Sequence, residues 1–240
     1  PLEADRIPLL GSAITELHFF SANSGVATGF FSLGNDEFVL RTANGAQNWT
    51  LAFEGTTGPY PRYYNDLFFQ DNTEGWAVGA NGHLLHTQNS GATWLPVSIP
   101  GVAWELYSIG FSNAQNGFIG GTGGLLRSTN GGVTWAQINA SGSSLAAPNV
   151  TQCIGFSTVV PHRFYVAGDG GSILYANADG KPVTTWGTGA SAPNPDCRQF
   201  YIQPNAAGTD DLVYATTDQG LWLIRTMSVP GSALTGLSGG

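Results

Sequence analysis

The sequence is poor in charged residues, and above all in lysine. Only 10% of its 240 residues are charged, with eight Lys or Arg, sixteen Asp or Glu and a net charge of −8 at neutral pH. Lysine occurs once, as Lys181. Proteins that bind nucleic acid neutralise phosphates with clustered Lys and Arg. The acidic balance and the scattered basic residues therefore argue against nucleic acid as a partner.

Long hydrophobic runs are also missing. No stretch approaches the roughly 20 consecutive apolar residues that a membrane-spanning helix needs. The opening segment PLEADRIPLL lacks the basic-then-apolar order of a signal peptide. The sequence therefore predicts a soluble chain without a transmembrane segment, in the form it would have after processing.

Cysteines and metal-ligand patterns are sparse. Cys153 and Cys197 are too few for a disulfide-rich scaffold or a four-thiolate zinc site. The four histidines share no ligand spacing with a carboxylate or a thiol. The Asp-Gly turn GDGGS at 168–172 lacks the alternating carboxylates of a calcium loop. We expect no metal and no cofactor.

Turn-forming and apolar residues, by contrast, are abundant. The sequence contains 34 glycines and 13 prolines, and 42% of its residues are hydrophobic. This composition is typical of many short strands that are joined by tight turns around a sizeable core. The sequence therefore predicts an all-β fold.

A repeat of about 40 to 50 residues runs along the chain. VGANGHLLHTQNSGATW at 78–94 aligns with GGTGGLLRSTNGGVTW at 120–135, and AGDGGSILYANADGKPVTTW at 167–186 is a looser copy. An apolar strand pattern precedes each copy and recurs every 42 to 49 residues. The equivalent residues in that pattern are Phe20, Phe69, Phe111, Phe156 and Ile202. A period of this length is typical of β-propeller blades.

The repeat predicts a single β-propeller domain over residues 1–240 with five blades of four strands each. The predicted blades cover about 14–53, 64–100, 106–140, 150–191 and 197–226. The fifth unit lacks a fourth strand, and the N-terminal RIPLL at 6–10 is predicted to supply it and close the ring, which removes exposed strand edges. The alternative is a disordered N-terminal arm. Residues 227–240 are predicted to form a C-terminal tail.

Two segments of the repeat resemble a known motif. TQNSGATW at 87–94 and STNGGVTW at 128–135 resemble the Asp-box, or BNR, repeat, with Asn in place of its Asp, and TANGAQNW at 42–49 is a looser copy. The longer phrases GWAVGANGHLLHTQNSGATW and NGFIGGTGGLLRSTNGGVTW are similar to blades of the photosystem II stability and assembly factor family. This likeness spans about residues 14–226. It implies a partner: a protein subunit or a membrane complex met in a lumen or periplasm.

The box itself is predicted to be structural. The side chains of Asn89 and Asn130 are expected to hydrogen-bond the backbone of their turns, and a glycine to take the left-handed conformation. Trp94 and Trp135 are expected to pack between strands. These residues therefore direct the search for a binding site to other parts of the chain.

The mouth of the propeller is the expected binding site. The aligned copies place Glu16, Asn65, Tyr107, Gln152 and Arg198 at the start of the first strands, nearest the axis. Polar and aromatic residues are dense around two of these positions, and the predicted binding residues are Tyr60, Tyr63, Tyr64, Asp66, Trp104, Glu105, Tyr107 and Arg198. Such side chains suit sugar rings or a peptide segment. The alternative is that the aromatic residues pack between the second and third blades.

Patterns that would indicate catalysis are weak. Glycoside hydrolysis needs two carboxylates that face each other, and Asp66 and Glu105 form such a pair only by proximity in the predicted mouth. Three arginines, Arg41, Arg127 and Arg225, occupy one repeat position on separate blades and cannot converge on one carboxylate as a sialidase requires. We predict no catalytic residue.

The two cysteines have one expected role. Cys153 and Cys197 precede the fourth and fifth apolar strand patterns, and neighbouring inner strands of a propeller approach closely. A disulfide between them is predicted, which would place the chain in an oxidising compartment. Two buried thiols are the alternative.

Together these features predict a non-enzymatic protein-binding or assembly module that lies outside the cytoplasm, in a periplasm, in a thylakoid lumen or secreted. Its expected partner is a protein subunit or a membrane-associated complex. The alternative function is a carbohydrate-active propeller, either a glycoside hydrolase or a lectin, with a sugar ligand. A third reading is a structural subunit within a larger complex.

Overall fold

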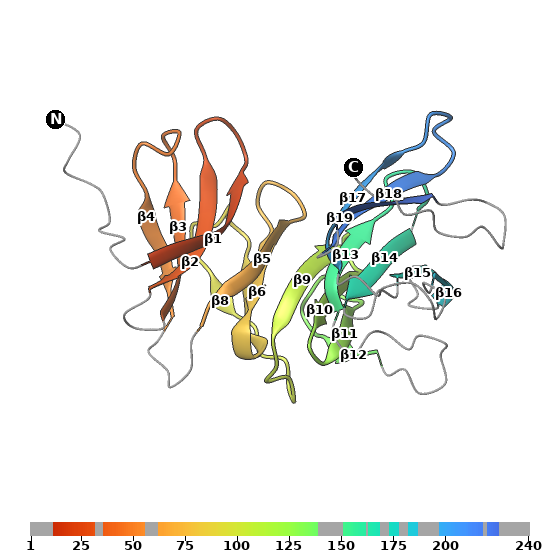
Figure 1. Ribbon diagram of the computed structural model, residues 1–240. Coiled ribbons are helices and arrows are strands. Elements are labelled where there is room, and N and C mark those ends of the chain that lie inside the picture. The colour runs from red at the N-terminus through yellow and green to blue at the C-terminus, as the bar shows by residue number, and fades with distance from the viewer. Residues whose placement is uncertain are drawn as a thin grey trace. The chain divides into compact units, whose positions relative to one another are not determined.

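The computed structural model describes residues 12–31, 36–55, 62–138, 151–161, 163–168, 173–177, 182–186, 197–217 and 220–225 (Figure 1). The strands at 173–177 and 182–186 are described by their backbone alone. The chain divides into two compact units, Pro1–Ile109 and Gly110–Gly240. Each unit is described by itself.

The first unit contains two four-stranded antiparallel sheets, each with its strands in chain order. The first sheet consists of β1 (Ser12–Phe19), β2 (Gly25–Phe31), β3 (Asp36–Thr42) and β4 (Thr50–Glu54). The second consists of β5 (Tyr64–Phe69), β6 (Gly75–Gly79), β7 (Leu84–Thr87) and β8 (Leu95–Pro96). A 3₁₀ turn, η1 (Ala80–Gly82), lies between β6 and β7.

Three more antiparallel sheets follow, and the division between the units falls within β9. The third sheet consists of β9 (Leu106–Phe111), β10 (Gly117–Gly121), β11 (Gly124–Ser128) and β12 (Ala136–Gln137). The fourth consists of β13 (Thr151–Phe156), β14 (Arg163–Gly168), β15 (Ile173–Asn177) and β16 (Pro182–Trp186). The fifth consists of β17 (Cys197–Pro204), β18 (Asp211–Thr217) and β19 (Gly220–Arg225).

This topology confirms the all-β class and the antiparallel arrangement of strands that follow one another in the chain. The five-bladed ring and its closure stay predictions. The segment predicted to close the ring, residues 6–10, lies outside the described residues, as does the predicted tail at 227–240. In the described part of the chain, no helix has the length and apolar character needed to cross a membrane.

The core of the first unit lies between its two sheets. Val26 and Val39 of the first sheet pack with Ala77 and Leu85 of the second and with Trp94, which precedes β8, and all of them are buried. In the second unit, Phe118 and Phe164 stack with ring centroids 4.1 Å apart. Flat apolar layers of this kind hold sheets face to face because each sheet alone would leave its apolar face in water.

The repeated Phe and Trp residues form the same contact twice. Phe69 and Trp94 meet edge to face with ring centroids 5.9 Å apart and planes at 78°, and Phe111 and Trp135 show the same distance and angle. The glycine that opens the next strand leaves space for the Phe ring: a Cβ on Gly75 would lie 2.4 Å from it. Packing of the Phe ring therefore explains why a glycine begins the pairs Gly75-Trp76 and Gly117-Phe118.

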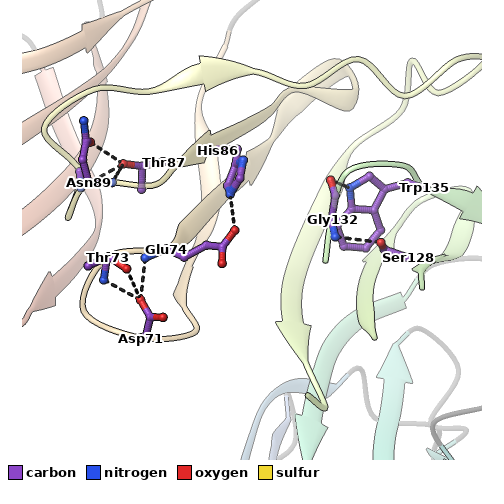
Figure 2. Close-up of polar contacts among 10 residues, drawn as sticks. Asp71, Thr73, Glu74, His86, Thr87, Asn89, Ser128, Gly132 and Trp135 are labelled. Carbon is purple, nitrogen blue, oxygen red and sulfur yellow. Dashed lines mark hydrogen bonds and ion pairs between the residues drawn. The ribbon is translucent and has the colours of Figure 1, made fainter. Parts of the chain in front are cut away.

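The Asn of each box organises its turn as predicted, and Figure 2 shows the contact between Asn89 and Thr87 in the 87–94 copy. In the 87–94 copy, the Asn89 Oδ1 atom accepts the Thr93 N–H at 2.9 Å and the Thr87 hydroxyl at 3.1 Å. The Thr87 hydroxyl in turn accepts the Gly91 N–H at 3.1 Å. Gly91 has φ +72°, in the left-handed region, and the Trp94 indole donates to its carbonyl at 3.2 Å.

The other two copies repeat this network. At 128–135, the Asn130 Oδ1 atom accepts the Thr134 N–H at 3.0 Å, and the Trp135 indole donates to the Gly132 carbonyl at 3.0 Å. In the looser copy at 42–49, the Asn44 Oδ1 atom accepts the Asn48 N–H at 2.9 Å. The structural role that the sequence predicts for the box is therefore confirmed.

A second repeated turn supports the box, and the sequence analysis missed it. The Asp71 Oδ1 atom accepts the N–H groups of Thr73 and Glu74 at 2.7 and 2.8 Å in the turn between β5 and β6 (Figure 2). The Thr73 carbonyl then accepts the Ser90 N–H from the box turn at 2.9 Å. The first and third sheets tie the same two turns together through Asn23 and Gln115. Short polar side chains that cap a turn are its sequence signal.

Candidate binding surface at the heads of the first strands

The first strand of four sheets carries a β-bulge near its N-terminal end. The strand pairing advances by one residue on one side only, which leaves one residue without an opposite partner in the sheet. These extra residues are Thr15 in β1, Asn65 in β5, Gln152 in β13 and Arg198 in β17. A bulge turns a side chain out of the regular alternation of a strand, and bulges are common at binding sites.

The bulges correct one position of the sequence alignment. The alignment placed Glu16 in the row of Asn65, Gln152 and Arg198, whereas the pairing places Thr15 there. The sequence alignment was therefore wrong by one residue in β1. The bulged residue can be identified only from the pairing of β1 with β2, which places Thr15 between the paired residues Ile14 and Glu16. Glu16 is instead the counterpart of Asp66.

Three predicted polar and aromatic residues of the first unit meet at the head of β5. The Tyr63 hydroxyl donates to both oxygens of Glu105, at 3.0 and 3.1 Å. Burial, and after it the hydrogen bond and charge of Glu105, raises the pKa of the Tyr63 phenol, and the nearby Tyr107 adds to this shift. Tyr63 therefore stays a neutral hydrogen-bond donor at any physiological pH.

The bulged residue of β5 joins this group. The Asn65 side-chain amide donates to the Leu106 carbonyl at 2.8 Å and lies 3.5 Å from a Glu105 oxygen. Because Leu106 opens β9, this bond ties the head of β5 to the head of the next first strand. Tyr63, Asn65, Glu105 and Tyr107 are all partly buried, so each keeps part of its surface in water.

Asp66 acts as a strut between the same two strands. Its Oδ2 atom accepts the Ile109 N–H at 2.8 Å, and its Oδ1 atom accepts the N–H of Leu67 at 2.8 Å. Burial raises the pKa of the Asp66 carboxyl to about 6, against the lowering effect of these N–H groups and the Ser108 hydroxyl, and the charge of Glu16 raises it further. Both oxygens are thus engaged by backbone N–H groups, and the Oδ2 atom links β5 to β9.

Among the predicted aromatic residues, Tyr64 does not belong to this surface. Its side chain is completely buried in the core between the first two sheets, so it is unavailable to a partner, and the prediction of a binding role was wrong for it. The cause is strand alternation: Tyr63 precedes β5, whereas Tyr64 points to the opposite, core-facing side. Tyr60 lies outside the described residues.

The remaining predicted site residues divide between the two units. Trp104 is partly buried in the loop before β9, and its carbonyl accepts the Gly82 N–H at 2.8 Å. Arg198 is exposed on β17 of the second unit. Its membership in one site with Tyr63 and Glu105 stays a prediction.

The predicted disulfide also stays a prediction. Cys153 is buried in the core of the second unit, and its thiol donates to the Ala167 carbonyl at 3.7 Å. The side chain of Cys197 lies outside the described residues. Within the residues that the structure describes, no three His, Cys, Asp or Glu side chains gather as a metal site would require.

A match to one protein family bears on this surface. Residues 53–159, a little under half of the chain, match the family model of the photosynthesis system II assembly factor YCF48. The predicted resemblance is confirmed. The matched stretch contains the two best box copies and the contacts of Tyr63, Asn65, Asp66 and Glu105. No curated protein matches the chain.

Solved structures show the same fold at low sequence identity. A structure described as YCF48 bound to D1 peptide is 16% identical with a TM-score of 0.59 and covers 89% of this chain. YCF48 from Cyanidioschyzon merolae is 14% identical with a TM-score of 0.62 and covers 95%. An ancestral GH74 enzyme is 18% identical with a TM-score of 0.66 and covers 88%.

The chain is shorter than these relatives. It spans 63% of the YCF48 chain that is bound to the D1 peptide, 71% of the Cyanidioschyzon merolae protein and 30% of the GH74 enzyme. Fold alone does not choose between an assembly factor and a hydrolase, because unrelated functions share the propeller.

Proposed function

We propose that this chain is a non-enzymatic protein-binding module of the assembly-factor type, and that it holds a segment of a partner protein at the surface formed by Tyr63, Asn65, Glu105 and Tyr107. The proposal takes its partner class from the family match, because that family is named for photosystem II assembly. The related YCF48 structure with a bound D1 peptide supports a protein ligand.

One observation carries the assignment to this surface. Tyr63 and Glu105 are 42 residues apart in the chain, yet they are joined by two hydrogen bonds and both remain partly open to water. An aromatic ring that is fixed beside a carboxylate offers an apolar face and an acceptor for peptide N–H groups. Fixed aromatic side chains of this kind are frequent anchors in protein interfaces.

A glycoside hydrolase is the second candidate, favoured by the likeness to the GH74 enzyme. It requires two carboxylates that are free to act on a sugar. Asp66 accepts backbone N–H groups with both of its oxygens, and Glu105 is held by Tyr63. This use of both carboxylates favours the binding module.

We also propose that the module works outside the cytoplasm, as a subunit or assembly factor of a membrane protein complex. The support is the family match, since the family is named for photosystem II assembly. Fractionation of the source cells, with protease protection of the intact compartment, tests this location. Recovery in the cytoplasmic fraction alone would overturn it.

The experiment on the function uses immobilised full chain and peptides that tile the soluble segments of photosystem II subunits, D1 included. We expect at least one peptide to bind saturably, and Glu105→Gln to weaken it about tenfold, as the loss of an interface hydrogen-bond acceptor does. Val133→Ala is the matched control, because Val133 is 70% exposed on a box turn.

Two results would count against the proposal. One is the absence of saturable binding to any peptide. The other is equal weakening by the control variant, which would indicate non-specific adsorption. A glycan array with the same protein tests the carbohydrate alternative, and a sugar that binds at the Glu105 surface would replace the protein-binding assignment.

A further inference from the structure

A cavity of about 470 Å³ lies within the first unit, apart from the surface at Tyr63 and Glu105. It is formed by the ends of β3 and β4 on one side and by the segments around β7 and β8 on the other. Its polar residues are Glu37, Glu54, Arg62, Asn81, His83 and Ser98. Its size is within the range of small-ligand sites.

Glu37 is the unusual group in this cavity. Its side chain is only 2% exposed. The Oε1 atom lies 3.0 Å from His83 Nδ1 and 3.9 Å from Arg62 Nη1. The Oε2 atom has no hydrogen-bond partner among the described residues. An ionised carboxylate has about four acceptor sites, and leaving one oxygen buried without a donor is costly.

The Glu37 carboxylate packs directly against the backbone of Gly55. Gly55 also lines the cavity, and a Cβ at this position would lie 2.3 to 2.7 Å from the Glu37 carboxyl atoms. The Gly55 N–H donates to the Glu37 carbonyl at 2.8 Å, so the two residues are held in register. Any larger residue at 55 would displace the carboxylate from its place in the cavity wall.

The opposite wall of the cavity is apolar. Its apolar residues are Leu84, Leu85, Pro96, Val97, Ile99 and Val102, and Phe53 adds an apolar side chain from β4. A ligand that fits both walls has a hydrogen-bond donor with positive charge at one end and an aliphatic stem behind it. An anion would meet two carboxylates, Glu37 and Glu54, and a single guanidinium, so the balance of charge favours a cation.

We propose that this cavity is a binding site for the basic side chain of a lysine or arginine in a partner polypeptide, with its charged group on the Glu37 carboxylate and its stem against the apolar wall. The inference rests on the proposed function in one respect, namely that the basic group belongs to a protein partner. Burial strengthens the Coulomb attraction of this carboxylate for a cation, and the carboxylate has already lost most of its hydration in the folded chain.

The test titrates the full chain with N-acetyl-arginine amide, with its neutral analogue N-acetyl-citrulline amide and with N-acetyl-lysine amide, by NMR. We expect saturable shifts at cavity residues such as Gly55 and Val102 with the two basic probes, and at least tenfold weaker binding of the citrulline probe. Equal affinity for the charged and neutral probes would overturn the inference, as would shifts that do not saturate.

Variants separate the cavity from general effects on folding. Glu37→Gln and Gly55→Ala should each weaken the arginine probe at least tenfold. Arg62→Ala should strengthen it several-fold, because it removes the guanidinium that lies 3.9 Å from the carboxylate. The Arg62 side chain is 25% exposed, so we expect this variant to fold. Unchanged or weaker binding in Arg62→Ala would contradict the proposed charge pairing even where Glu37→Gln fails to fold. Leu95→Ala, on β8 with 71% of the side chain exposed, is the control.

A separate experiment tests whether the basic group belongs to a protein partner. A partner peptide that binds at the Glu105 surface should lose affinity in Glu37→Gln when it contains Lys or Arg, and a peptide with these residues replaced should not. If putrescine binds the cavity and Glu37→Gln leaves every peptide unaffected, the protein source is wrong. Binding of peptides without any response to the basic probes would overturn this inference and leave the proposed function standing. Binding of the basic probes without any peptide would overturn the proposed function and the protein source of the basic group, and would leave only the preference of the cavity for a cation.

Discussion

Single carboxylates in this protein have different roles because their surroundings differ. Asp71 is exposed in a turn, and the N–H groups of Glu74 and Thr73 together with the Thr73 hydroxyl lower its pKa. Asp66 bridges two strands, and burial outweighs its hydrogen bonds, so its pKa is raised to about 6. Glu37 is buried beside a cavity with one oxygen unpartnered among the described residues. Of these carboxylates, Asp66 links two strands and Glu37 lines the cavity of the first unit.

The raised pKa of Asp66 predicts a dependence of stability on pH. Its folded pKa of about 6 exceeds the ordinary value of 3.8, so the folded state binds more protons than the unfolded state between these values. The contribution of Asp66 to the free energy of unfolding therefore falls as pH rises through this window, by about 1.4 kcal/mol per unit of pKa difference. Urea unfolding of the wild type and of Asp66→Asn between pH 4 and 7 measures it, and the variant should lose this part of the slope.

Asp71→Asn is the matched control for that measurement. Because the folded pKa of Asp71 is lowered, its contribution is present at neutral pH and is lost as pH falls, which is the opposite sign. Identical pH profiles for the wild type and Asp66→Asn would contradict the assigned titration. A direct NMR titration of the Asp66 carboxyl would then measure its pKa in the folded state.

At the scale of the element, each of the first three sheets has two turns that are joined to one another. The box turn and the Asp, Asn or Ser turn before the second strand are joined by one backbone hydrogen bond in each of the first three sheets. In the second sheet, His86 adds a tie to Glu74, with His86 Nε2 and Glu74 Oε1 3.0 Å apart (Figure 2). The capping side chains thus provide hydrogen-bond partners for backbone groups in the turns, where no strand pairing satisfies them.

The box network predicts how its central residue responds to substitution. Asn89→Ala removes the acceptor of the Thr93 N–H and Thr87 hydroxyl, and we expect it to lower the free energy of unfolding by about 1 to 2 kcal/mol. Asn89→Asp keeps the Oδ1 atom that accepts from both groups and restores the residue of the family motif, so it should cost less than half as much. Equilibrium unfolding of the two variants measures this, and equal losses would show that the hydrogen bonds to the side-chain oxygen are unimportant.

Much of the fold could be predicted from the sequence because the strands and the box turns depend on residues that are close together in the chain. Asn89, Gly91 and Trp94 lie within six residues, and their network is complete without any distant segment. The candidate site was less accessible. Tyr63 and Tyr64 are adjacent and alike in the sequence, yet one lies at the surface and the other in the core. The bulge at Thr15 leaves no mark in the sequence because it is a property of the pairing with β2.

At the scale of the whole molecule, the repeat predicts a ring whose last blade is completed by residues 6–10. In the first unit as the structure describes it, Leu17 and Phe19 of β1 are 57% and 44% exposed. Large apolar side chains in an exposed first sheet are what a neighbouring blade would cover in a closed propeller. If the ring is closed, preventing its closure should lower the stability of the chain by a measurable amount.

Deletion of residues 1–10 tests closure. If this segment supplies a strand, its loss exposes the edge of the last sheet, and we expect a fall in melting temperature of several degrees and faster hydrogen exchange in β17 to β19. A chain that lacks only residues 231–240 is the control, since the predicted tail contributes no strand. If both truncated chains melt like the full chain, the N-terminal segment is an unattached arm.

The sequence by itself determined the all-β class, the order of the strands and the box turns, because these follow from short-range patterns that are written several times along the chain. The tertiary structure decided which side chains are available: it placed Tyr64 in the core, joined Tyr63 to Glu105 and enclosed Glu37 beside a cavity. These outcomes depend on strand register and on the packing of one sheet against the next. Such contacts join residues about 40 positions apart, and no local pattern in the letters records them.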